Sequence, residues 1–120
     1  MAPILSVSYD QALLRTRELL LKQTAEYAVT SALGFTEAVE CCRTGQFDLF
    51  ILGHSIPLKD KLELIKVFRT RCAAPVLALR KMGEVTPDGA DAHVDPNDID
   101  SLLEAVKTLM PGSTDATIAG

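Results

Sequence analysis

The sequence predicts a three-layer α/β/α domain built on a parallel sheet, because short apolar runs alternate with amphipathic segments of helical period along its 120 residues. Parallel strands need right-handed crossover connections, so the intervening helices are expected to cover both faces of the sheet. Five such strands in a chain of this length predict a flavodoxin-like, doubly wound sheet with the strand order 2-1-3-4-5. The runs expected to form strands are residues 4–7, 27–31, 48–52, 75–79 and 92–94.

Four helices are predicted from apolar positions that recur every three or four residues. Asp10 is expected to cap the first helix, which ends near Thr24, and Asp98 is expected to cap the last. The second helix is expected to be capped by Thr36 and to end at Gly45. The residues expected to face the sheet are Leu13, Leu14, Arg17, Leu20 and Leu21 in the first helix, Phe35, Ala38, Val39 and Cys42 in the second, Leu62, Ile65, Phe68 and Cys72 in the third, and Leu102, Leu103, Val106, Leu109 and Met110 in the last.

The segment that follows the fourth strand is too rich in turn-forming residues for a long helix. Gly83, Pro87 and Gly89 lie close together there, so the crossover helix that the fold would place between the fourth and fifth strands is expected to be shortened or missing. Residues 1–110 are expected to form one domain, and residues 111–120, which are rich in Gly, Ser, Thr and Ala, a flexible C-terminal tail.

The composition is that of a globular protein, and the net charge argues against nucleic acid and anionic membranes as binding partners. Hydrophobic residues make up 48% of the chain and charged residues 23%, and the net charge of -4 provides no clustered positive charge for nucleic acid or an anionic membrane. Cys41, Cys42 and Cys72 form neither a disulfide framework nor a metal-ligand spacing, and no long apolar span is present. We therefore expect a cytoplasmic domain that binds neither nucleic acid nor membrane, with its cysteines serving as small apolar residues.

Five local strings carry a resemblance to a known family when they are taken in order: ILSVSYDQALLR, FDLFILGHSIP, APVLAL, GADAHVDP and DSLLEAVKTL. Together they resemble the receiver domains of response regulators over nearly the whole chain. In that family an acidic pair after the first strand holds Mg²⁺, and an aspartate after the third strand accepts a phosphoryl group. The resemblance places the acidic pair on Ser8 and Tyr9 and the acceptor on Gly53. It places the family's hydroxyl residue after the fourth strand on Arg80, and its lysine after the fifth strand on Asp95.

These replacements predict a degenerate receiver, or pseudo-receiver. Mg²⁺ prefers hard oxygen ligands and is usually held by carboxylates, which Ser8, Tyr9 and Gly53 do not supply. Glycine also has no side chain that could act as the nucleophile. We expect no catalytic activity, no metal and no cofactor. The expected function is a phosphorylation-independent interaction module of two-component signalling, whose partner is a protein of the pathway or a second copy of the chain.

Two alternative functions remain open. In the first, the domain is an atypical receiver that is phosphorylated at a substitute residue, His54 or Asp60. In the second, it senses a small ligand in the crevice around Tyr9, His54 and Arg80. Asp10 is the other acid near the crevice.

The candidate residues also have simpler interpretations. Asp10 is expected to act as a helix cap, Asp60 to lie in a loop, and the Tyr9 ring to plug the site instead of stacking on a ligand. A further hypothesis is that Arg80 and Asp95, which follow neighbouring strands, form an ion pair that fills the crevice.

Overall fold

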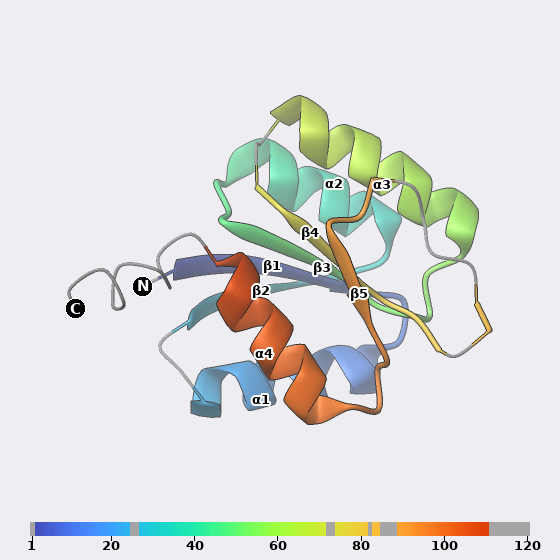
Figure 1. Cartoon of the computed structure of the whole chain (residues 1–120). Helices are drawn as coiled ribbons and strands as arrows, with labels where there is room; N and C mark the ends of the chain where they lie inside the picture. The colour runs from blue at the N-terminus through green and yellow to red at the C-terminus, as the bar shows by residue number, and fades with distance from the viewer. Residues whose placement is uncertain (1, 25–26, 72–73, 82, 85–88, 111–120) are drawn as a thin grey trace.

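The computed structural model describes residues 2–24, 27–71, 74–81, 83–84 and 89–110, and it confirms the predicted flavodoxin-like architecture (Figure 1). All neighbouring strands pair in parallel, in the order β2-β1-β3-β4-β5. The strands are β1 (Ala2–Ser8), β2 (Tyr27–Leu33), β3 (Leu49–Leu52), β4 (Val76–Leu79) and β5 (Ala92–Val94). The helices are α1 (Gln11–Thr24), α2 (Phe35–Thr44), α3 (Leu58–Arg71) and α4 (Ile99–Leu109).

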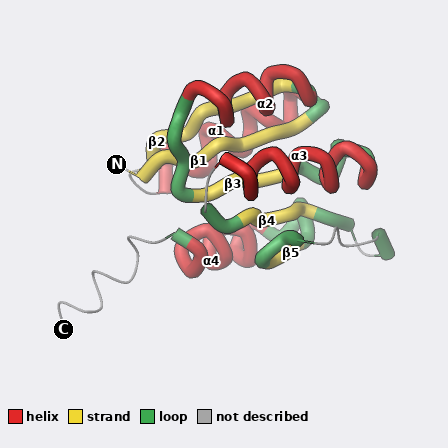
Figure 2. Tube along the Cα trace, turned by 90° about the horizontal axis from the view of Figure 1, so that it is seen from above, coloured by secondary structure: helices red, strands yellow, loops and turns green. Residues whose placement is uncertain are grey.

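The sheet separates two apolar layers. Helices α2 and α3 cover one face, and α1 and α4 cover the other (Figures 1 and 2). Leu5 and Val7 of β1 pack beneath α2 and α3, whereas Ile4 packs toward α1 and α4, as the alternation of side chains along a strand requires. Every residue of β3 and β4 is buried, because these strands are covered on both faces.

Two of the three predicted side-chain caps of helices are confirmed, and the third is wrong. The Asp10 carboxylate accepts hydrogen bonds from the two backbone N–H groups at the start of α1, and Asp98 does the same for one in α4. The expectation that Thr36 caps α2 is wrong, because the helix begins at Phe35. Gly34 precedes it with φ of 94°, a value that favours glycine, and no side chain caps this helix.

The buried faces of α1 and α3 differ from the predicted stripes at particular positions. Leu13 is 38% exposed and Leu62 is only half-buried, and Lys61, which lies outside the predicted stripe of α3, is buried. Arg17 is buried, as its place on the predicted stripe of α1 implies. Leu13 leaves the buried face because the sheet covers only part of the helix circumference, and Leu14 and Leu21 already fill it. Cys72, the last predicted position on α3, lies outside the described residues.

Residues 80–81, 83–84 and 89–91 of the connection from β4 to β5 contain no helix, in agreement with the expectation that the crossover helix is shortened or missing. The last part of this connection is fixed by Asp91, whose carboxylate accepts hydrogen bonds from Arg69 of α3 at 2.8 Å and from the backbone N–H of Val76 at 2.7 Å. The predicted tail, residues 111–120, lies outside the described part of the chain. None of the described helices combines the length and the apolar character that a membrane crossing requires.

Candidate functional site

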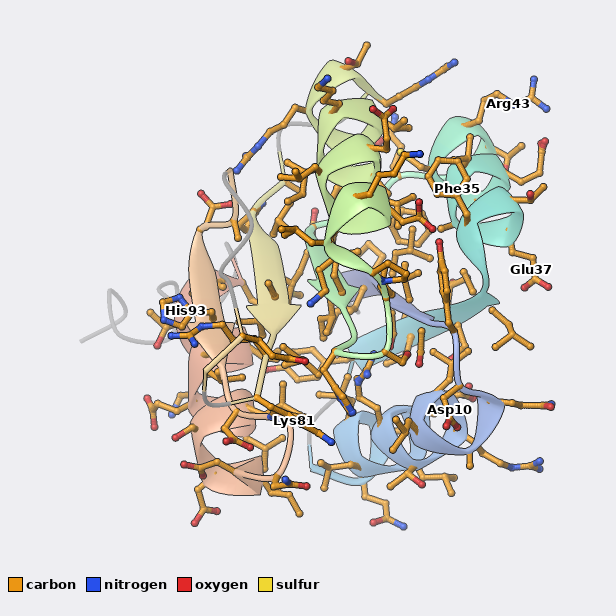
Figure 3. All side chains as sticks on the ribbon, turned by 90° about the vertical axis from the view of Figure 1, so that its right-hand side faces the viewer. Asp10, Phe35, Glu37, Arg43, Lys81 and His93 are labelled. Carbon is orange, nitrogen blue, oxygen red and sulfur yellow. The ribbon has the colours of Figure 1, made fainter. Side chains whose placement is uncertain are left out.

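The strand ends bring the sequence-predicted positions to one edge of the sheet. Ser8 ends β1, and Gly53, Arg80 and Asp95 directly follow β3, β4 and β5. In a doubly wound sheet this edge is where ligands bind. Figure 3 views the molecule from this side, with Lys81 near the ends of α1 and α4.

A buried arginine from α1 lies beside Gly53. Arg17 is only 6% exposed, and its Nη1 donates hydrogen bonds to Ser6 Oγ at 2.8 Å and to the Val7 carbonyl at 3.3 Å. A Cβ atom added at Gly53 would lie 2.8 Å from Arg17 Nη2. The guanidinium therefore takes up the space into which any side chain at position 53 would extend.

Arg17 brings a positive charge to this edge of the sheet. Burial lowers the pKa of its guanidinium to about 10, so the group stays charged at neutral pH. Within the described part of the chain no carboxylate forms an ion pair with it. An unpaired buried charge is costly, so this arrangement is a feature that core packing alone does not explain.

A second buried cation reaches the same edge from the opposite face. Lys61 of α3 is 4% exposed, and its Nζ donates a hydrogen bond to the Leu79 carbonyl, at the end of β4, at 3.3 Å. Burial lowers the pKa of this ammonium, and the negative charge of Glu84 partly opposes that shift. The leucine stripe of α1 predicts burial of Arg17 but no role for it, and no motif of the sequence points to Lys61. A charged residue on an apolar helical face is the signal that points to both.

Serine hydroxyls hold the end of β1 to the loop after β3. Ser8 Oγ and Ser55 Oγ lie 3.1 Å apart, and the Tyr9 backbone N–H donates to Ser55 Oγ at 3.1 Å. Ser8 Oγ also donates to the Asp10 carbonyl at 3.1 Å. The position that the resemblance assigned to a metal-binding carboxylate is thus used for neutral hydrogen bonds. Nothing in the sequence motifs pointed to Ser55.

Tyr9 turns toward α3. Its hydroxyl donates a hydrogen bond to Asp60 Oδ2 at 2.7 Å, and its ring packs against the apolar cluster beneath α2 and α3. Asp60 was expected in a loop, but it lies in the first turn of α3 because that helix starts at Leu58, directly after Pro57. The Tyr9–Asp60 contact therefore joins the β1–α1 connection to α3.

Replacing Tyr9 with phenylalanine tests this contact. We expect Tyr9→Phe to lower the free energy of unfolding by about 1 kcal/mol, the usual net value of one hydrogen bond. Burial, and then the hydrogen bond to Asp60, raise the pKa of the Tyr9 phenol above 10.0, so the stabilisation is complete below pH 10 and is lost as the pH rises further. Urea unfolding at neutral and alkaline pH measures both effects. Equal stability of the two proteins at neutral pH would contradict the role of the contact.

His54 follows Gly53 and is half-buried. Its Nδ1 is buried without a hydrogen-bond partner. Burial, and then the positive charge of Lys81, lower the pKa of its imidazole from 6.5, so the ring is neutral at pH 7. No group of three or more potential metal-binding side chains of His, Cys, Asp or Glu is present among the residues that the structure describes.

The hypothesis of an ion pair between Arg80 and Asp95 is wrong. Arg80 Nη1 donates to the Glu84 carbonyl at 3.1 Å, and Asp95 Oδ1 accepts from the Asn97 backbone N–H at 2.8 Å. Each side chain forms a hydrogen bond with the backbone of its own turn. Such a local hydrogen bond costs less conformational entropy than an ion pair between two separate strand ends. Arg80 Nε is buried without a partner.

The edge does not suit the Mg²⁺ that the family resemblance implies. Ser8 and Tyr9 offer no carboxylate at the end of β1, and Gly53 offers no side chain. The Arg17 guanidinium lies against Gly53 and would repel a divalent cation. These residues therefore favour an anion over a metal ion at this position.

Comparison with known proteins places this fold in a class. No protein-family model and no curated protein sequence matches the chain. The chain is similar in structure to solved receiver domains of response regulators. The fold is thus that of the CheY-like receiver domains.

Three of these structures show the extent of the similarity. Response regulator TrrA from Thermotoga maritima, solved in complex with Mg²⁺ and BeF, is 25% identical with a TM-score of 0.75, over 91% of this chain and 99% of that one. The receiver domain of Francisella response regulator 1452 is 20% identical with a TM-score of 0.78, over 92% and 97% of the two chains. Vibrio cholerae CheY4 is 21% identical with a TM-score of 0.72, over 91% and 98%.

Proposed function

We propose that this chain is a receiver-like domain of two-component signal transduction that works without phosphorylation, through contacts with a protein partner. Support for the signalling class comes from the receiver structures that share its fold over more than nine-tenths of the chain. Support for a protein partner comes from another similar structure, in which CheY6 of R. sphaeroides is in complex with the phosphorylated P1 domain of CheA3.

The observation that carries the proposal is the contact between Arg17 and Gly53. If Gly53 stands at the acceptor position, the chain has no nucleophile there, and a Cβ would lie 2.8 Å from the Arg17 Nη2 atom. In a phosphorylated receiver a metal ion and a phosphoryl group share this space, whereas here a fixed guanidinium fills part of it. The domain would then hold one conformation, set by its own side chains instead of by a phosphodonor.

Incubation with acetyl phosphate and Mg²⁺, followed by intact-mass spectrometry, tests the proposal. We expect no mass increase in this protein. TrrA of T. maritima, treated in parallel, is the positive control because its solved structure holds Mg²⁺ and BeF.

A stable phosphoryl adduct would contradict the proposal. The variants His54→Gln and Asp60→Asn identify the substitute residue in that case, because loss of the adduct in one of them assigns the site. The Nδ1 atom of His54 is buried, and Asp60 already accepts the Tyr9 hydroxyl hydrogen bond, so neither is expected to react.

A further inference from the structure

A groove lies between α1 and the start of α4, beside the strand ends. Its volume is about 250 Å³, below the range of roughly 300–1,000 Å³ that is common for sites of drug-sized ligands. One side comes from α1 and the other from the β5–α4 connection and α4, which cover the same face of the sheet (Figure 1). The lining residues that matter here are Arg17, His54, Leu13, Leu20, Ile99 and Leu102.

The polar part of this groove has unused hydrogen-bonding capacity. Within the described structure only Ser6 and Val7 accept hydrogen bonds from Arg17, both from Nη1, so Nη2 has no acceptor there. The neighbouring His54 Nδ1 is buried and also lacks a partner. A guanidinium that is more than nine-tenths buried and lacks a carboxylate is an incomplete ion pair.

The charges near His54 are mainly positive. Arg17 from α1, Lys61 from α3 and Lys81 after β4 all act on the imidazole, and Glu84 is the acid that opposes them. The Glu84 carboxylate is itself engaged, because its Oε1 accepts the Lys81 backbone N–H at 2.7 Å. An anion is therefore the ligand that this end of the groove would attract.

The rest of the groove is apolar and partly open. Leu13 on α1 is 38% exposed and Ile99 at the start of α4 is 50% exposed. Leu20 and Leu102 form the deeper wall between them. Exposed leucine and isoleucine side chains next to a buried cation suit a ligand with an apolar body and one anionic group.

We propose that this groove binds a compact organic carboxylate, with the carboxylate on Arg17 and the hydrocarbon body between Leu13 and Ile99. A carboxylate accepts two parallel N–H groups of a guanidinium, which gives the site its orientation. The site rests on the proposed function in one respect, because the bound carboxylate would be the signal that this domain receives in place of phosphorylation. Binding of the carboxylate can be measured whether or not the chain is phosphorylated, so the two proposals can fail separately.

The ligand would also change the protonation of His54. The imidazole faces Arg17, Lys61, Lys81 and Glu84, and the three cations favour its neutral form. A bound carboxylate offsets these charges and so raises the pKa of His54, which couples binding to proton uptake. Affinity for the carboxylate is therefore expected to rise as the pH falls from about 8 to about 6.

Titration with benzoate and with hexanoate, followed by ¹H–¹⁵N NMR, tests the site in the full chain. We expect saturable shifts at the Arg17 side-chain Nε–H and at the amides of His54 and Ile99. The neutral isosteres benzamide and hexanamide are expected to bind at least tenfold more weakly, as loss of a charge-assisted hydrogen bond implies. Absence of saturable shifts with both carboxylates would overturn the proposal. Equal binding of inorganic phosphate would also overturn it, because the apolar walls would then contribute nothing.

Matched variants locate the carboxylate. Arg17→Met is expected to weaken benzoate binding by roughly tenfold to a hundredfold, whereas Arg15→Met, an exposed residue on the same helix, is expected to leave it unchanged. Ile99→Asp, which leaves Arg17 in place, is also expected to weaken binding and guards against a folding defect in the first variant. His54→Gln is expected to remove the pH dependence. Unchanged binding in both Arg17→Met and Ile99→Asp would place the ligand elsewhere and overturn the proposal.

Discussion

Replacing Gly53 with alanine is expected to lower the free energy of unfolding by about 1–3 kcal/mol, the usual cost of adding a methyl group to a packed site. The new Cβ would lie 2.8 Å from Arg17 Nη2 and 3.1 Å from the Val7 carbonyl oxygen. Arg17 cannot move aside freely, because it is buried and hydrogen-bonded to Ser6 and Val7. The φ angle of Gly53 is not positive, so space, not backbone conformation, favours glycine here.

A double-mutant cycle separates the effect of Arg17 from other effects of the added methyl group. In the Arg17→Met background, Gly53→Ala is expected to cost clearly less than in the natural sequence, because the closest obstructing group is gone. Arg15→Met is the control background and is expected to leave the cost unchanged. Urea unfolding of the single and double variants gives the coupling free energy. A coupling near zero would contradict the account of the Arg17–Gly53 contact.

The largest loss of stability is expected from Phe68→Ala, at about 3–5 kcal/mol. Phe68 of α3 and Phe50 of β3 are both fully buried, and their rings stack with centroids 4.0 Å apart and an interplanar angle of 6°. Truncation removes this contact and leaves a cavity between α3 and the sheet. Since a domain of this kind is stable by roughly 5–15 kcal/mol, the variant is expected to approach partial unfolding at room temperature.

Phe68→Leu is the matched control for this prediction. It keeps most of the apolar volume, so a loss of less than half that of Phe68→Ala is expected. Chemical denaturation measures both variants, and thermal unfolding of Phe68→Ala supports the result if the midpoint falls. Similar losses for alanine and leucine would show that the ring stack, not the cavity, accounts for the stability at this position.

The fold followed from the sequence because its strongest signals are local. The apolar runs that became β3 and β4 are buried on both faces, as their uniform hydrophobicity predicted. The prediction for Thr36 failed because Gly34, with a positive φ that favours glycine, precedes the first residue of α2, and no side chain caps this helix. The position of Leu13 was missed because a helical stripe of leucines does not show how much of it the sheet will cover.

The site was less predictable because its central contact joins residues far apart in sequence. The family resemblance predicts a missing side chain at Gly53, but nothing in the sequence around this residue shows that Arg17 fills the space. The leucine stripe of α1 predicts that Arg17 faces the sheet, but it does not show whether the guanidinium lies inside or extends past the edge toward water. Only the packing of α1 against β1 turns the guanidinium inward, to Ser6 and Val7.

We propose that the Arg17 guanidinium takes the place of the acceptor side chain and metal ion of the receiver family, so that the domain has one state that does not respond to a phosphodonor. Titration with Mg²⁺ and beryllofluoride, followed by ¹H–¹⁵N NMR, tests it most directly. We expect no saturable shifts at the amides of Ser8, Gly53 and His54, under conditions in which TrrA of T. maritima responds. Saturable shifts at these three amides would show that the edge still forms the metal–phosphoryl site and would contradict the claim.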